Sequence, residues 1–105
     1  MPELIYEHSA RVEDDEGTVY VPRTYGQARG DGTWSGWIEF HPLDGEGLFL
    51  RTDQETTQPN RAALAYWASG LEPIYFEGAF ARVAHLLVRL HPDQLASRFE
   101  QQARE

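Results

Sequence analysis

The sequence predicts an α+β domain in which an antiparallel meander of three or four strands is followed by two or three helices packed on one face of the sheet. Two observations predict this class. Apolar and polar residues alternate with a period of two in the first half of the chain, and beyond Gln58 the apolar residues recur with a period near 3.6. Segments rich in aspartate and glycine separate the alternating runs, which favours tight turns. At 105 residues we expect one domain over 1–105, β-rich over 3–57 and helical over 58–104.

The alternating half contains four candidate strands. Residues 4–8 alternate weakly, and residues 18–28 (TVYVPRTYGQA) are rich in β-branched and aromatic side chains. Pro22 has no N–H to donate, so it predicts an edge position or a bulge in the second run. The clearest strand is 33–41 (TWSGWIEFH), and 47–52 (GLFLRT) makes the next.

The strand at 33–41 predicts two different faces, of which one carries Ile38 and Phe40. An odd number of loop residues would place Leu48 and Leu50 on that same face, whereas an even number would scatter them. We therefore expect an odd loop, with Gly45 or Gly47 at the positive-φ position of a bulge. The opposite face then gathers five candidate interface or ligand residues: Trp37, Glu39, His41, Phe49 and Arg51.

The aromatic content suggests a use for this second face. Three Trp, five Tyr and five Phe exceed what the core of so small a chain needs, so we expect some to be partly exposed. Trp37 beside Arg51 could belong to the core, anchor a protein interface or form a platform for a small ligand, because Trp and Arg are common interface anchors. We expect non-enzymatic protein interaction, self-association included; the alternative is a small enzyme or ligand-binding protein that uses Trp37, Glu39 and His41.

A helix with start and stop signals follows the strands. Thr57 or Gln58 can cap it, and Pro59 is tolerated in its first turn because the missing N–H would have no partner there. Gly70 predicts a left-handed stop, and Pro73 prevents continuation. The apolar residues form one stripe: Leu64, Trp67, Ala68 and Leu71.

Tyr66 lies about 200° from Leu64 around this helix, so we expect it outside the stripe. After Pro73 two alternatives stay open. The better fit to the period is a second amphipathic helix that starts with Pro73 in its first turn; the other makes residues 73–78 a short strand before that helix. A last helix is expected over 93–105, with Leu95 and Phe99 on one face.

Charge and composition exclude several classes of function. Seventeen acidic groups against nine basic ones give a net charge of −8, which opposes binding to phosphate backbones; we expect no direct nucleic-acid ligand, and the charge would favour a basic protein partner. Cysteine is absent and the four histidines lack metal-site spacing, so we expect no metal and no cofactor. No apolar stretch suits a membrane span or a signal sequence, so we expect a cytoplasmic protein.

Catalytic pairs can be drawn, but they are not specific. Glu39 could act with Asp53 or Glu55 as a pair of carboxylates, and His41 could serve as a base beside Thr52 or Ser35. Pairs of this kind can be drawn on almost any acidic domain.

Residues 33–73, TWSGWIEFHPLDGEGLFLRTDQETTQPNRAALAYWASGLEP, resemble the central segment of small bacterial proteins to which no activity is attached. In the order of its elements alone, the chain also resembles the HicB-type antitoxin domain, a β-meander followed by a helix and a further strand. In that family the acidic domain neutralises a small basic ribonuclease, so the resemblance implies a basic protein partner. The departure lies after Pro73, where this sequence favours a helix.

Overall fold

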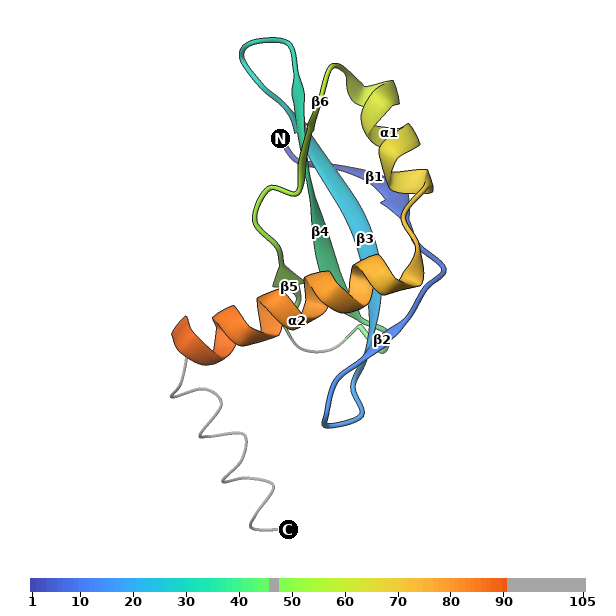
Figure 1. Ribbon diagram of the computed structural model, residues 1–105, viewed down its shortest axis with the longest axis vertical. Coiled ribbons are helices and arrows are strands. Elements are labelled where there is room, and N and C mark those ends of the chain that lie inside the picture. Colours follow the sequence, from blue (N-terminus) through green and yellow to red (C-terminus); the bar gives the residue numbers. More distant parts are fainter. Residues whose placement is uncertain (46–47, 91–105) are drawn as a thin grey trace.

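The computed structural model describes residues 1–45 and 48–90 (Figure 1). Within these residues one antiparallel sheet is followed by two helices, which confirms the α+β prediction. The strands are β1 (Glu3–Glu7), β2 (Val12–Glu13), β3 (Val19–Ala28), β4 (Trp34–Pro42), β5 (Leu50–Arg51) and β6 (Thr56–Gln58). The helices are α1 (Arg61–Ser69) and α2 (Pro73–Leu90).

The six strands occupy four positions across the sheet, because each edge position is shared by two short strands. The central strands β3 and β4 form a long hairpin. On one side of it β1 and β2 both pair with β3, and on the other side β5 and β6 both pair with β4. Each edge is thus built from two short strands in place of one long strand.

The turn between β3 and β4 fixes the register of this hairpin. Arg29 N–H donates to the carbonyl of Thr33 (2.7 Å), and the three intervening residues end in Gly32 at φ +89°. A glycine at this place in a three-residue hairpin loop accommodates the left-handed conformation without strain. The resulting register sets Tyr25 opposite Trp37.

Pro22 lies in a central strand, so the predicted edge position is wrong. The irregularity of this part of the sheet falls in β1, between Leu4 and Tyr6. Pro22 is accommodated because its outward side faces the gap where the chain passes from β1 to β2. There its carbonyl accepts a hydrogen bond from His8 N–H (3.1 Å). Neither β1 nor β2 pairs with Pro22, so no ladder hydrogen bond on this side requires the N–H that proline lacks.

Both helices pack on the face of the sheet that carries Ile38 and Phe40 (Figure 1). Leu50 pairs with Phe40 in register, as the odd loop predicts, and Gly45 has the expected positive φ of +76°. Leu48 does not join this face: it precedes β5 and is 71% exposed. The core contains residues from both layers: Val12, Tyr20, Ile38, Phe40, Leu50, Phe76, Ala79 and Val83.

Helix α1 starts later than the sequence predicts. Asn60 is the N-cap, and its side chain accepts a hydrogen bond from Ala63 N–H (2.8 Å). Thr57 and Gln58 cannot serve as the cap because they belong to β6 and pair with β4. Gly70 ends the helix in a right-handed conformation (φ −93°), so the predicted left-handed stop is also wrong.

A pair of glycines lets α1 approach the sheet closely. Gly26 on β3 and Gly36 on β4 lie directly opposite each other, and Leu64 of α1 fills the space above them. A methyl group at either glycine would overlap the Leu64 side chain. Leu64 is fully buried as a result.

Helix α2 begins at Pro73, which confirms the helical alternative for this segment and rules out the other alternative, a short strand over 73–78. In the same place the HicB-type layout has a strand. Neither described helix has the length and apolarity needed to cross a membrane. The helix expected over 93–105 lies outside the described residues.

The connection between β5 and β6 is tied to α2 by one carboxylate. Glu55 accepts hydrogen bonds from both terminal nitrogens of Arg82 (2.7 and 2.9 Å) and from the Tyr75 hydroxyl. The Arg82 guanidinium holds the pKa of Glu55 below its usual range, and burial raises the pKa of Tyr75. Glu55 therefore points to the helical side of the sheet.

Candidate functional site on the open sheet face

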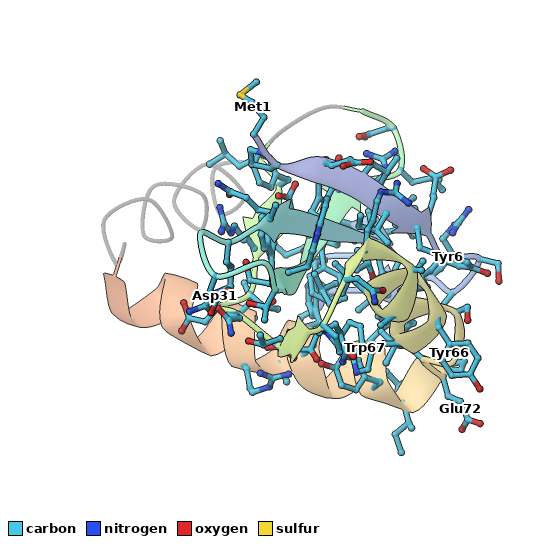
Figure 2. All side chains as sticks on the ribbon, turned by 90° about the horizontal axis from the view of Figure 1, so that it is seen from above. Met1, Tyr6, Asp31, Tyr66, Trp67 and Glu72 are labelled. Carbon is cyan, nitrogen blue, oxygen red and sulfur yellow. The ribbon has the colours of Figure 1, made fainter. Side chains whose placement is uncertain are left out.

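The sheet has a second face on which no described helix packs. Figure 2 shows the strands as one layer and both helices as another on a single side of it. We call the opposite side of the sheet the open face. Its central hairpin places three residue pairs in direct register: Val21 with His41, Arg23 with Glu39, and Tyr25 with Trp37.

The five residues predicted from the alternation come together on this face. Trp37 Nε1–H donates to Glu39 Oε2 (2.9 Å), and His41 Nε2 lies 2.9 Å from Glu39 Oε1. The guanidinium of Arg51 lies over the indole of Trp37, 4.1 Å from the ring centroid. Phe49 stacks on His41, with ring centroids 4.8 Å apart and planes 11° from parallel.

The centre of this face is almost fully removed from water. Trp37 is 3% exposed although no described helix lies above it, and Glu39 is 8% exposed. Arg51 shields the indole through a cation–π contact, which is stronger when the ring is removed from water. Phe49 is the exception, because half of its surface (51%) faces solvent. The cluster is thus a preformed surface with one exposed aromatic ring.

The carboxylate of Glu39 is fully engaged inside this cluster. One oxygen accepts from the Trp37 indole and the other contacts the His41 imidazole. Among the described residues, every buried side-chain polar atom has a hydrogen-bond partner. No unpartnered buried group of the open face therefore points to a ligand.

The structure separates three of the four catalytic pairs drawn from the sequence, and the pair of Glu39 with Asp53 stays a prediction. Glu55 lies on the helical side of the sheet, away from Glu39, because Arg82 and Tyr75 hold it. Thr52 is buried, and its hydroxyl accepts from Ile38 N–H (3.0 Å) and donates to the Asp53 carbonyl (2.8 Å).

Ser35 cannot work with His41 either. The two residues lie six positions apart on β4, about 20 Å along an extended strand. The pairing of His41 with Thr52 or Ser35, and that of Glu39 with Glu55, is wrong.

The sequence did not point to Glu7, Arg23 and Tyr25, the further charged and aromatic residues of the open face that contact one another or His41. Arg23 Nε donates to Glu7 Oε1 (2.8 Å), and the Tyr25 ring lies 6.0 Å from that of His41. The length of the hairpin loop could have placed Arg23 and Tyr25 on this face, because a three-residue loop over 30–32 sets Tyr25 opposite Trp37. No such local signal exists for Glu7, whose register depends on the irregularity in β1.

The described part of the chain contains no group of three or more His, Asp or Glu side chains that could hold a metal ion. Comparisons with protein-family models, with curated proteins and with solved structures find no match to this chain.

Proposed function

We propose that this chain is a non-enzymatic protein-interaction domain that binds a protein partner, a second copy of itself included, through the open face. The observation that supports the proposal is the aromatic and arginine cluster on a sheet face that neither described helix covers. An antiparallel sheet with one solvated face normally presents polar residues there. Here a half-exposed Phe49 and the stacked pair of Arg51 and Trp37 occupy it.

The rigidity of the cluster favours binding. Glu39 is held by Trp37 and His41, and Arg51 is held by Trp37, so few rotamers remain to be ordered when a partner docks. Each freely rotating side chain that an interface immobilises costs about 0.5–1.5 kcal/mol. Aromatic and arginine side chains of this kind contribute much of the affinity of protein interfaces.

The charge of the molecule favours some classes of protein partner over others. A net charge of −8 would speed encounters with a basic protein. The open face itself carries both signs of charge, since Arg23 and Arg51 lie beside Glu7 and Glu39. Its chemistry therefore also suits a partner of mixed charge.

One contact favours a second candidate, a small enzyme or ligand-binding protein. His41 and Glu39 approach to 2.9 Å, as a general base and the carboxylate that orients it do. An enzyme of this kind would lose its activity on Glu39→Gln. A protein-binding face would keep most of its affinity, because glutamine can still contact Trp37 and His41.

A site-specific photo-crosslinker tests the proposal. Phe49 is replaced by benzoyl-phenylalanine in the cells that express the chain, and Tyr66 is replaced in a matched control. Tyr66 is also an exposed ring (83%), but it lies on α1 on the helical side. We expect a discrete protein adduct at position 49 and none at position 66. Absence of an adduct at 49, or equal adducts at both positions, contradicts the proposal.

A further inference from the structure

Four charged residues of alternating sign form one row across the open face. Glu7 of β1 lies opposite Arg23 of β3, Arg23 lies opposite Glu39 of β4, and Glu39 lies opposite Arg51 of β5. The row therefore crosses all four positions of the sheet and reads acid, base, acid, base. At the usual spacing of strands it is about 14 Å long.

A row of this kind is complementary to its own reverse. If a second copy is turned by 180° about an axis parallel to the strands, its row runs in the opposite direction above the first. Each acid then faces a base: Glu7 faces Arg51, and Arg23 faces Glu39. An axis along the row would instead place each residue above its own counterpart, with like charges in contact.

We propose that the open face binds a second copy of this chain about a two-fold axis parallel to the strands, with Glu7 of each copy against Arg51 of the other. The proposal rests on the proposed function and names its partner. Two sheets that pack face to face lie about 10 Å apart with their strands rotated by about 30°, which long charged side chains can span. The interface is isologous, so each contact occurs twice.

The exposure of the side chains favours the contacts between Glu7 and Arg51 over those between Arg23 and Glu39. The side chain of Glu7 is 56% exposed, and Arg51 is exposed although its guanidinium is held on Trp37. Glu39 is mostly covered by its own neighbours and offers less to a second copy. Two exposed apolar side chains of the open face, Leu4 (46%) and Phe49 (51%), would also be removed from water in this dimer.

The same row also stabilises the sheet of a single copy. Opposite charges on adjacent strands contribute about 0.2–1 kcal/mol per pair, and Glu7 already accepts from Arg23 (2.8 Å). Loss of stability in a single variant does not separate the two roles. Mixing two variants separates the roles, because mixing can restore contacts between copies but not contacts within one copy.

Sedimentation equilibrium of the full chain and two charge reversals, Glu7→Arg and Arg51→Glu, tests the dimer. We expect the parent to dimerise. Each variant alone should dimerise about ten-fold more weakly or worse, because position 7 then faces a like charge at position 51. An equimolar mixture should form a heterodimer, since Arg at 7 in one chain meets Glu at 51 in the other, while the unchanged Arg51 of the first meets the unchanged Glu7 of the second.

Glu72→Arg is the matched control for Glu7→Arg, because both raise the net charge by two, and Glu72 is an exposed site on the helical side. It should leave the parent's dimerisation unchanged. If either reversal fails to fold, Glu7→Gln and Arg51→Gln replace them, and each should weaken the dimer in part.

Three results overturn the proposal: a monomeric parent, as when another segment or another protein covers the face; variants that do not recover on mixing; or an equal effect of Glu72→Arg. The proposed function survives such a result if benzoyl-phenylalanine at position 49 still crosslinks to a different protein.

Discussion

At the level of single residues, His8 lies between the sheet and α2 as a neutral imidazole. It is 5% exposed, its Nε2 lies 2.7 Å from Thr24 Oγ1, and its ring is 4.5 Å from that of Phe76. Burial lowers the pKa of His8 from 6.5 to about 4. As pH falls through this window the unfolded chain binds a proton that the folded chain does not, so stability present above pH 6.5 is lost towards pH 4.

We predict that His8 accounts for up to about 3 kcal/mol of the acid loss of stability over this window. Urea unfolding at about pH 7 and about pH 4.5 measures it in the parent and in His8→Gln. Glutamine can still contact Thr24 but does not titrate, so the variant should be less stable at neutral pH and should lose less on acidification. Equal losses in the two proteins would show that carboxylates alone set the acid limit.

At the level of elements, the two neighbouring aromatic residues of α1 have opposite roles. Figure 2 shows Tyr66 pointing outward and Trp67 pointing toward α2. Trp67 packs against the core and meets the Tyr75 ring edge-on at 6.0 Å between centroids, whereas Tyr66 is 83% exposed. The predicted phase of this helix is therefore confirmed.

Trp67→Ala should destabilise the protein by about 3 kcal/mol or more, since it empties a packed site between α1 and α2. Tyr66→Ala should cost about 1 kcal/mol or less. Thermal melts at several protein concentrations measure both. A concentration-dependent loss in the Tyr66 variant would place a subunit contact on α1 and would count against the open face as the only interface.

The docking of α1 depends on the absence of two side chains from the sheet. Gly36→Ala should cost about 1–3 kcal/mol because its methyl group would overlap Leu64. In the double variant with Leu64→Ala, the cost of the two changes should be less than additive, because the overlap is gone. Gly30→Ala is the control: it has a negative φ and open space where the methyl group would be. Denaturant unfolding of the parent, Gly36→Ala, Leu64→Ala, the double variant and Gly30→Ala measures these costs.

At the level of the whole molecule, the central strands were predictable because their rules are local. Alternation with a period of two placed Trp37, Glu39 and His41 on one face, and the contacts among these three side chains follow from it. The odd loop set Leu50 opposite Phe40 and so brought Arg51 to the same face as Trp37. Their use in binding stays a prediction.

The edges of the sheet were not predictable, because distant contacts determine where they break. The chain leaves the first edge at His8, whose ring contacts Thr24 sixteen residues away, and leaves the second at Thr52, which bonds to Ile38. The pairing of residues 56–58 with β4 likewise displaced the start of α1 to Asn60. The row of Glu7, Arg23, Glu39 and Arg51 was not predictable for the same reason, because Glu7 lies opposite Arg23 only after the register shift in β1.

The charge balance of the whole molecule predicts that it does not bind duplex DNA or RNA. The net charge is −8, and within the described residues three arginines form ion pairs with carboxylates: Arg23 with Glu7, Arg61 with Glu3, and Arg82 with Glu55. Arg51 lies on the indole of Trp37. These four arginines are engaged within the described part of the chain, which lowers the number of cations that can displace counterions from a phosphate backbone, the source of non-specific affinity.

Fluorescence anisotropy with a labelled duplex at about 150 mM salt should therefore show no binding tighter than about 1 µM. The variant Glu3→Gln/Glu7→Gln serves as the comparison, because it frees Arg61 and Arg23 from their partners without adding a basic residue. It should bind no better than the parent at this salt concentration, since two exposed cations remain outweighed by the other acidic groups. A submicromolar affinity that weakens steeply as salt is raised would contradict the prediction, and its loss on Arg51→Glu would move the nucleic acid to the open face.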